Sequence, residues 1–369
     1  MRCCLLVVLL AACGDGWMND ARVVVDGVHA FERDCRTGIC VHNENTDLAV
    51  FDGATYLVHR TAASQILGPN SSLRVSRSED HGKTWRLLAV IPAIEGRDLR
   101  DPSFYQIGDR LAIKALTRLQ VTSLRDSDVD TIAVGSVSPD AGKTWSPLVP
   151  IGPPGWSFWR IRDDARGVHY TAAYEDGDKS VKLFSSSDGT TWAGGASIYS
   201  RSEDTPLETE LVFMPSGKLL ALVRLDGDNH ELFGNAGRLR TRVCWAAPPF
   251  ATWDCSRELH GVRLDGPVAF FHRSRLFVIA RKHMLEPEGR KRTALYELTG
   301  DLDGGDLSIA ERGELPSAGD TAYAGVAPID RDHVLVTWYS SRVAADQSWI
   351  FGALGPTDIW QATLDLSQL

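Results

Sequence analysis

The sequence predicts an all-β fold, and three observations support this prediction. Short runs of alternating apolar and polar residues occur throughout the chain, as at 49–58, 218–223 and 333–339, each bounded by Gly, Asp, Asn or Pro. Helical periodicity is nearly absent. No linker or low-complexity tract interrupts the regularly spaced strand signals, which favours one large domain at 14–369 over several small ones.

Residues 1–13 have the layout of a secretory signal, with Arg2 followed by an apolar run at 5–10. This run is too short to span a bilayer as a helix. The Leu-Ala-Ala-Cys motif ending at Cys13 resembles the lipobox of bacterial lipoproteins, which implies cleavage before Cys13 and its acylation as the membrane anchor. An ordinary secretory signal is the alternative. Because Gly14 rather than Asp follows Cys13, the resemblance implies an exported lipoprotein of the outer membrane.

Besides the lipid-bearing Cys13, four cysteines remain in the expected mature chain, and an even number in an exported protein predicts disulfides. Cys35 lies close to Cys40 in the sequence, and Cys244 lies close to Cys255. Two short-range disulfides are therefore the expected pairing. Zinc binding is the alternative, but no His or Cys lies near either pair at zinc-finger spacing.

The formal net charge of −9 argues against nucleic acid or an anionic surface as a partner, so we expect membrane contact through the lipid anchor alone. No compact metal motif is present in the sequence, and we expect no cofactor. An anionic substrate would need positive charge concentrated in one pocket against this acidic background. The positions of the arginines are therefore the informative ones.

A turn motif recurs three times, as SEDHGKTW at 78–85, SPDAGKTW at 138–145 and the shorter SSDGTTW at 186–192. In such a turn Asp and Ser bond nearby backbone amides, Gly takes a positive φ angle and Trp packs between neighbouring sheets. The tryptophans are 60 and 47 positions apart, which suits one four-stranded propeller blade per interval.

These motifs resemble Asp-boxes, the hairpin signature of the sialidase-type propellers. The resemblance implies an all-β, six-bladed β-propeller of sialidase type, while the spacing by itself also allows seven blades. Asp-boxes in that superfamily lie on the rim away from the active site, so Asp80, Asp140 and Asp188 are poor catalytic candidates.

Further stretches are similar to the bacterial group of sialidase-like proteins labelled exo-α-sialidase, and the similarity covers most of the mature chain. The matching stretches are HNENTD at 42–47 with YLVHR at 56–60, RDLRDP at 97–102, FWR at 158–160, the segment 208–224, LFVIAR at 276–281 and DTAYAG at 320–325.

The resemblance implies an arginine clamp for the carboxylate of an acidic sugar, since planar guanidinium groups bind carboxylates bidentately and stay charged. Its members would be Arg60, Arg224 and Arg281, each at the end of a predicted strand. The further substrate-binding candidates are Arg100, Arg160 and Asp320. The alternative is that each arginine is an ordinary solvated residue at a strand end.

The resemblance also implies that Tyr323 is the catalytic nucleophile and that Glu208 activates it. A carboxylate nucleophile would be repelled by the carboxylate of a sialoside, and sialidases use a tyrosine instead, with retention of configuration. Spacing to Gly217 favours Glu208 over Glu210. A core tyrosine with a satisfied hydroxyl is the alternative for Tyr323.

The general acid is missing from its usual place, because residues 61–77 contain no Asp, Glu or His. Asp98 or Asp101 could supply it from the next blade, and Glu44 or Asp47 from upstream. No spacing argument selects among these four carboxyl groups.

We therefore expect an exo-acting glycoside hydrolase of sialidase type that removes terminal sialic acid or a related acidic sugar from glycans. A non-catalytic glycan-binding propeller is one alternative, and another exoglycosidase or a polysaccharide lyase on the same fold is a second, because a fold fixes no chemistry. The loops at 67–72, 125–130 and 227–238 are expected to border the mouth of the pocket.

Overall fold

Strands dominate the computed structural model, which describes residues 16–369 apart from 31, 33, 67, 69–70, 120–129, 176–178, 228–238, 286 and 288. Helix in this described part is confined to α1 (Trp349–Leu354) and the single 3-10 turns η3 (Val343–Ala345) and η4 (Leu366–Gln368). None of these helices is long and apolar enough to cross a membrane. The all-β prediction is confirmed.

Several sequence predictions concern residues outside the described ranges. They are the signal segment 1–13 with Cys13, most of the loops at 125–130 and 227–238, and three residues of the loop at 67–72.

Four sheets each contain four consecutive antiparallel strands. The first has β6 (Arg97–Ile107), β7 (Arg110–Leu119), β8 (Ile132–Ser138) and β9 (Val149–Pro150), and the second has β10 (Ser157–Asp163), β11 (His169–Glu175), β12 (Ser180–Ser186) and β13 (Ala193–Ser200). The third has β14 (Pro206–Phe213), β15 (Leu219–Leu225), β16 (Arg240–Ala246) and β17 (Asp254–His260), and the fourth has β18 (Asp265–His272), β19 (Arg275–His283), β20 (Lys291–Gly300) and β21 (Leu307–Leu315).

The remaining strands form one eight-stranded sheet. They are β1 (Met18–Val25), β2 (His42–Phe51), β3 (Ala54–Ala62), β4 (Ser72–Ser78), β5 (Arg86–Pro92), β22 (Thr321–Pro328), β23 (His333–Ser341) and β24 (Thr357–Asp365). A single parallel pairing of His42 with Thr357 joins β2 to β24. Strand β1 pairs with β24 as well, so the first and last strands of the fold lie side by side and close the ring.

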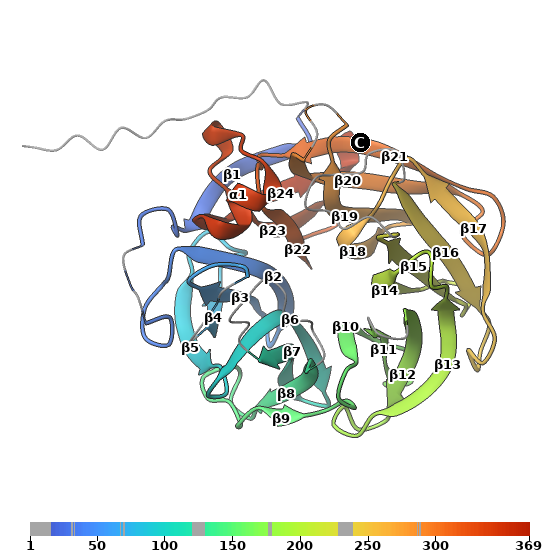
Figure 1. Ribbon diagram of the computed structural model, residues 1–369, viewed down its shortest axis with the longest axis horizontal. Coiled ribbons are helices and arrows are strands. Elements are labelled where there is room, and N and C mark those ends of the chain that lie inside the picture. The colour runs from blue at the N-terminus through green and yellow to red at the C-terminus, as the bar shows by residue number, and fades with distance from the viewer. Residues whose placement is uncertain are drawn as a thin grey trace, which may run out of the picture.

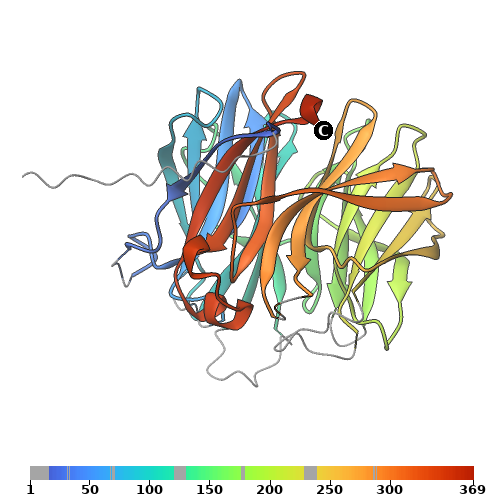
Figure 2. The same cartoon turned by 90° about the horizontal axis from the view of Figure 1, so that it is seen from above.

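The sheets are arranged around a central axis as in a β-propeller, with β2, β6, β10, β14, β18 and β22 innermost (Figure 1). Seen from the side, the strands run between two rims (Figure 2). Four blades stand as separate sheets, rather than the six that were predicted. The difference arises because the His42 to Thr357 pairing merges the strands of β2–β5 with those of β22–β24 and β1 into one sheet.

Apolar side chains pack between neighbouring sheets. Leu222 and Val243 of one sheet share a buried apolar cluster with Val278 and Tyr296 of the next, and similar clusters join the other neighbouring sheets. Such burial is the main favourable term in folding and fixes each sheet against the next. The inner strand ends near the axis are left to carry polar and charged side chains.

The three repeated turns share one hydrogen-bond pattern. The amide of Gly82 donates to Ser78 Oγ at 2.8 Å, and the amide of Thr84 donates to Asp80 Oδ1 at 2.9 Å. Equivalent bonds hold the turns at 138–145 and 186–192. Backbone and hydroxyl donors lower the pKa of Asp80 to about 2, so its carboxylate is committed to the turn.

The turns lie on the rim opposite the ends of the strands that carry the candidate arginines. In the β3–β4 ladder Ser78 pairs with Thr55, whereas Arg60 pairs with Leu73 at the other end. The turn tryptophans, Trp85 and Trp145 among them, pack against apolar clusters between sheets. These turns therefore serve the packing of the sheets.

Both expected disulfides are present. Cys35 is bonded to Cys40 ahead of β2, and Cys244 of β16 is bonded to Cys255 of the neighbouring strand β17. The prediction from cysteine spacing is confirmed.

Candidate active site

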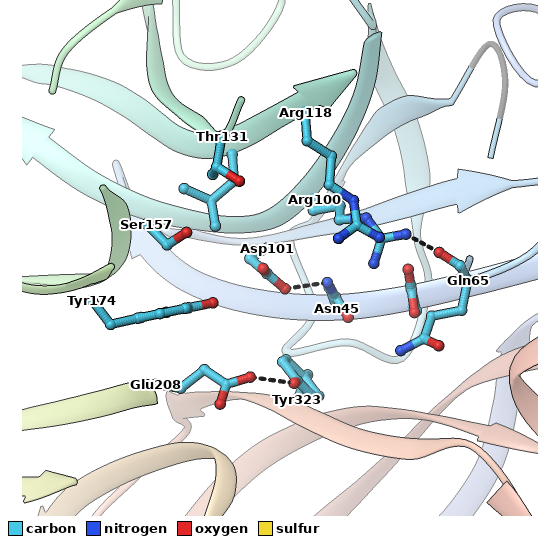
Figure 3. Close-up of a pocket in the computed structure, with 12 residues that line it drawn as sticks. Asn45, Gln65, Arg100, Asp101, Arg118, Thr131, Ser157, Tyr174, Glu208 and Tyr323 are labelled. Carbon is cyan, nitrogen blue, oxygen red and sulfur yellow. Dashed lines mark hydrogen bonds between the residues drawn. The ribbon is translucent and has the colours of Figure 1, made fainter. Parts of the chain in front are cut away.

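A pocket opens near the axis, on the rim where the innermost strands begin and the second strands end. This position follows from the antiparallel ladder, which pairs Glu44 at the start of β2 with Arg60 at the end of β3. The pocket is lined by Glu44, Asn45, Gln65, Arg100, Asp101, Leu116, Arg118, Thr131, Ser157, Tyr174, Glu208 and Tyr323 (Figure 3).

Tyr323 and Glu208 meet in this pocket. Tyr323 Oη donates a hydrogen bond of 2.6 Å to Glu208 Oε1. The backbone of Tyr323 has φ 49°, a left-handed conformation that is costly for a bulky residue and persists only when its surroundings enforce it. A break in the β22–β23 register at the same place turns the side chain toward the axis. The local distortion therefore positions the phenol at the pocket.

The neighbours of the Tyr323 ring fix its position. The ring of Trp159 lies 5.7 Å away in an edge-on arrangement, and the guanidinium carbon of Arg281 lies 5.2 Å from the centre of the Tyr323 ring. Gly266 leaves room on another side, since a Cβ there would come within 2.7 Å of the ring. Any larger residue at 266 would displace the phenol.

The phenol of Tyr323 is protonated near neutral pH. Burial and the negative charge of Glu208 hold the pKa of Tyr323 well above its ordinary value, against the opposing effect of Arg281 and Arg224. Reaction at this oxygen therefore needs a proton acceptor in contact with it, and Glu208 is in contact.

Arg224 holds Glu208 in place through two bonds from its Nη1, of 3.0 and 2.7 Å. Glu210 has a different environment. It is fully buried, accepts from Arg162 and from the amide of Ala269, and does not line the pocket. Of the two glutamates, Glu208 lines the pocket and Glu210 does not. Glu208 is also the one that the sequence spacing favoured.

Of the two aspartates in the segment 97–102, Asp101 lines the pocket and Asp98 does not. The backbone of Asp101 has φ 47° at a register shift in β6, and its carboxylate accepts a hydrogen bond from Asn45 (Figure 3). Lys114 Nζ donates to the carbonyl oxygen of Asp101 at 2.8 Å. Burial raises the pKa of Asp101 to about 6, and the charge of Glu208 acts in the same direction. A carboxyl group with such a pKa can give and take a proton near neutral pH.

Two of the other three acid candidates are held in ion pairs and do not line the pocket themselves. Asp98 is buried between Arg60 and Arg100, at 2.8 and 2.9 Å, and Asp47 accepts from Arg160 and a backbone amide. Neither is among the residues that line the pocket.

Glu44, the third, does line the pocket, but it is paired with Arg60. Burial alone would raise its pKa, yet Arg60 and His42 lower the pKa of Glu44 to about 2. It would be ionised and a poor acid at neutral pH.

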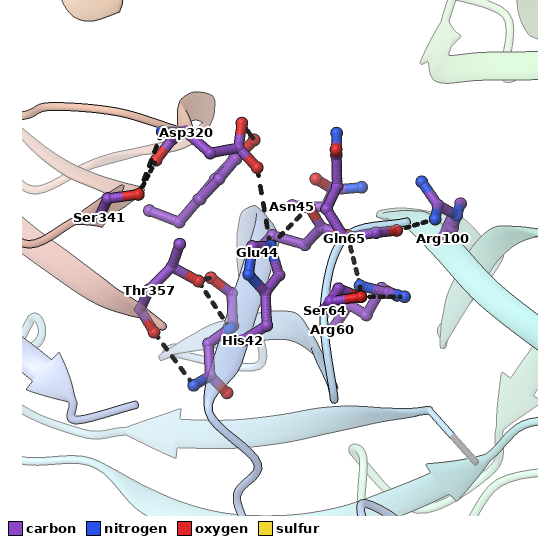
Figure 4. A network of polar contacts seen from close by, with 12 residues as sticks. His42, Glu44, Asn45, Arg60, Ser64, Gln65, Arg100, Asp320, Ser341 and Thr357 are labelled. Carbon is purple, nitrogen blue, oxygen red and sulfur yellow. Dashed lines mark hydrogen bonds and ion pairs between the residues drawn. The ribbon is translucent and has the colours of Figure 1, made fainter. Parts of the chain in front are cut away.

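Arg60, Arg160, Arg224 and Arg281 come to the axis from four different sheets, and each is matched by carboxylates. Arg60 contacts Asp98 and Glu44, Arg160 contacts Asp47, Arg224 contacts Glu208, Asp226 and Asp265, and Arg281 contacts Asp320 (Figure 4 shows Arg60). Their exposed fractions are 0%, 5%, 6% and 2%, and none lines the pocket. The arginines predicted to form a clamp are therefore buried against acidic partners, and their role in binding a substrate stays a prediction.

The pocket's own cationic side chains are Arg100 and Arg118. Arg100 was a candidate from the sequence, and it donates to Asp98 and to the carbonyl oxygen of Gln65. Sequence reasoning missed Arg118. One feature of the sequence could have identified Arg118 as a candidate. This arginine ends the run ALTR near the end of β7, and Arg60, Arg224 and Arg281 also lie near strand ends.

Asp320 belongs to a buried network beside the pocket (Figure 4). Its Oδ1 accepts from Arg281, Tyr339 and Trp349, and its Oδ2 lies 3.6 Å from His42 Nε2. The same nitrogen lies 3.3 Å from Glu44 Oε2. His42 Nδ1 lies 2.8 Å from the carbonyl oxygen of Gly355, which can only accept, so Nδ1 carries a proton.

His42, Glu44 and Asp320 have the donor types and spacing that could hold a metal ion. Arg60 and Arg281 contact the same two carboxylates and already balance their charge. A cation would have to enter between two guanidinium groups. The arrangement therefore fits an ion-pair network that ties β2 to the loop before β22 better than a metal site.

The fold is that of the sialidase-like β-propellers. NanB sialidase from Streptococcus pneumoniae superposes with a TM-score of 0.67 at 11% identity, over 92% of this chain and 70% of that one. Trypanosoma rangeli sialidase gives 0.64 at 16% identity, and this chain spans 59% of its length while 94% of this chain is covered.

A Dyadobacter fermentans protein of unknown function gives a TM-score of 0.64 at 18% identity, over 94% of this chain and 99% of that one. No family model and no curated protein sequence matches the chain. At these identities the likeness concerns the fold.

Proposed function

We propose that the protein is an exo-acting glycoside hydrolase that cleaves a terminal sugar with retention of configuration. The observation that carries the proposal is the 2.6 Å hydrogen bond between Tyr323 and Glu208 in a pocket that also holds Asp101. A pocket of this kind suits a terminal sugar. Two of the similar structures are sialidases, which supports a carbohydrate as the partner.

In the first step Glu208 takes the phenolic proton as Tyr323 Oη attacks the anomeric carbon. Asp101, protonated in this step, gives its proton to the departing glycosidic oxygen. In the second step Asp101 takes a proton from water, and the oxygen of that water displaces Tyr323 from the sugar. Glu208 returns the proton to the phenolate. Two displacements on one carbon give overall retention.

Two structural proposals accompany this function. We count the eight-stranded sheet as two blades that share an edge, which gives six blades in one domain from 14 to 369. We also propose that the protein is exported, because its two disulfides suit an oxidising compartment. The Leu-Ala-Ala-Cys motif supports a lipid anchor on Cys13.

The test is release of the aryl group from a panel of aryl glycosides that includes α-sialosides, α- and β-hexuronides and neutral hexosides. We expect turnover of at least one substrate by the purified full chain, reduced by about 10³-fold or more in Tyr323→Phe. Turnover of none of them, with sugar binding retained, would contradict the proposal and leave a glycan-binding propeller.

A further inference from the structure

We infer that a set of buried polar side chains outside the pocket positions the pair formed by Tyr323 and Glu208. Its members are Asp265, His283 and Lys291. None of the three is among the residues that line the pocket, so they act through Arg224, which holds Glu208. The inference rests on the proposed function and adds positioning residues to it.

Arg224 is shared between Glu208 and two aspartates. Its Nη1 donates to both oxygens of Glu208, at 3.0 and 2.7 Å. Its Nε and Nη2 donate to Asp226 at 2.6 and 2.9 Å, and Nε also lies 3.3 Å from Asp265 Oδ1. A guanidinium group is planar and rigid, so contacts that fix Nε and Nη2 also fix the direction of Nη1. The two aspartates therefore set the place at which Glu208 is held.

The carboxylate of Asp265, the first residue of β18, is oriented by two further side chains. His283 of the neighbouring strand β19 has its Nε2 2.7 Å from Asp265 Oδ2. Arg263 donates to Oδ1 at 2.8 Å and to Oδ2 at 3.1 Å. These contacts hold the carboxylate with Oδ1 toward Arg224. A change at His283 would thus be transmitted to the guanidinium group.

The position of the proton on His283 follows from its neighbours. Burial, together with Arg263 and Lys291, lowers the pKa of His283 to about 3, although Asp265 opposes the shift. The imidazole is therefore neutral and carries one proton. The Lys291 ammonium contacts Nδ1 and can only donate, so Nδ1 accepts. The proton is then on Nε2, which donates to Asp265. Arg263 Nη2 lies 2.8 Å from the same Nε2 and donates to Asp265.

Lys291 fixes this proton position while it is charged. Burial lowers the pKa of Lys291 to about 7, and the charges of Arg263, Arg281 and Arg224 act in the same direction, whereas Asp265 opposes them. Experiments on the set are therefore best made at about pH 6, where Lys291 keeps its proton.

Stability alone is a weak reason for this set. Asp265, His283 and Lys291 are 0%, 8% and 1% exposed. Apolar side chains of similar size in place of buried ionic groups are often neutral or stabilising. The contacts instead lead from Lys291 in β20 to Glu208, the group that accepts a hydrogen bond from Tyr323 (Figure 3). A positioning role explains why they converge there.

The first experiment compares two substitutions of His283 on the best aryl glycoside at about pH 6. His283→Leu removes the donor to Asp265, so kcat should fall about 10-fold or more, with KM changed less than about threefold, because no pocket residue is altered. His283→Gln keeps an N–H donor at nearly the reach of Nε2 and should restore most of kcat. Equal losses in the two variants, or no loss in either, would overturn the inference.

The matched control is His272→Leu. His272 is also 8% exposed and ends β18, at the opposite end of the strand from Asp265. It should retain the wild-type kcat. An equal loss of kcat in His272→Leu would show that removal of any buried histidine from this sheet has the same effect, and would overturn the inference.

Lys291→Met tests the other end of the set and serves if His283→Leu does not fold. Without the ammonium group, Nδ1 can take the proton, and Nε2 then accepts from Arg263 and no longer donates to Asp265. We expect kcat to fall at least about threefold at about pH 6 with KM little changed. An unchanged kcat would remove Lys291 from the set.

A measurement without turnover separates this inference from the proposed function. The full chain is labelled with ¹³C at the Cζ of tyrosine, and the Tyr323 signal is the one missing from Tyr323→Phe. Its chemical shift reports the hydrogen bond to Glu208. His283→Leu should move this signal, while His283→Gln and His272→Leu should leave it in place.

The two proposals can fail separately. That pattern of signals in a protein that turns over no glycoside would sustain the positioning role and refute the hydrolase. Turnover by the wild type, with a Tyr323 signal and a kcat that His283→Leu leaves unchanged, would do the reverse.

Discussion

Tyr323 Oη donates a 2.6 Å hydrogen bond to Glu208 Oε1, although 115 positions separate the two residues in the chain. Tyr323 lies near the start of β22 and Glu208 lies in β14, and the ring of sheets brings these two innermost strands to the same axis (Figure 1). A phenol with a strongly raised pKa therefore lies against the carboxylate that can accept its proton. The catalytic proposal depends on this contact.

Replacing Glu208 with Gln should lower kcat by about 10²- to 10⁴-fold, the usual contribution of a positioned general base. KM should change less, because the amide still fills the same space. The measurement is steady-state kinetics on the best aryl glycoside. The control is Glu203→Gln, which should retain full activity because Glu203 is exposed and lies three residues before the start of β14. A loss smaller than about threefold in Glu208→Gln would show that another group takes the proton.

The pH dependence of kcat/KM should report Asp101. The group must be protonated to act as the acid, and its pKa is raised to about 6, so activity should fall as the pH rises through about 6. Lys114 opposes this rise in pKa. Lys114→Met should therefore move the falling limb to higher pH. A limb that stays in place would mean that Asp101 is not the acid.

Asp101 should also affect stability. Its folded-state pKa lies above the ordinary value of 3.8, so the folded protein holds the proton more tightly than the unfolded chain does. The protonated carboxyl group therefore adds to the free energy of unfolding below pH 3.8, and this contribution is lost as the pH rises through about 6. Asp101→Asn should remove this loss and stabilise the protein by up to roughly 3 kcal/mol at pH 8, with little change at pH 4. Urea unfolding at the two pH values measures the difference. Equal effects at both would contradict the raised pKa.

Arg60→Met should destabilise the fold by about 3–5 kcal/mol, because it leaves Glu44 and Asp98 buried without their cation. Thermal unfolding of this variant beside Arg118→Gln tests the point, since Arg118 is half-buried at the pocket and its loss should cost less. A stable Arg60→Met protein with a raised KM would instead identify Arg60 as a substrate ligand.

Loss of the Cys244–Cys255 disulfide should cost about 3 kcal/mol, and loss of Cys35–Cys40 about 2 kcal/mol, because the first closes the longer loop in the unfolded chain. Denaturant unfolding of the two double Ser variants measures both. A larger effect from Cys35–Cys40 would point to its native contacts, such as the hydrogen bond from Ser72 to the carbonyl oxygen of Cys35.

The features that the sequence determined by itself are those that local patterns encode. Strand periodicity predicted the all-β fold, and cysteine spacing predicted both disulfides. The turn motif at 78–85 contains its own hydrogen-bonding partners within a few residues. The stretches around Glu208 and Tyr323 were recognisable because each motif is continuous in the chain.

Other outcomes depended on contacts between distant segments. Asp101 lines the pocket and Asp98 does not, because β6 has a register shift at Asp101 and Arg60 pairs with Asp98. Neither feature can be predicted from the spacing of the residues in the sequence. The merging of two strand groups into one sheet rests on the pairing of His42 with Thr357.

The arginines show the limit most clearly. Strand-end position marked Arg60, Arg224 and Arg281, but whether a guanidinium faces solvent, substrate or a buried carboxylate is decided by the side chains that the neighbouring sheets bring to it. Periodicity predicts which face of a strand is buried, but it does not predict which charged side chains of a neighbouring sheet will lie against that face. Only the closed ring of sheets sets those pairings, because ion pairs act through space over a few ångströms, irrespective of sequence distance.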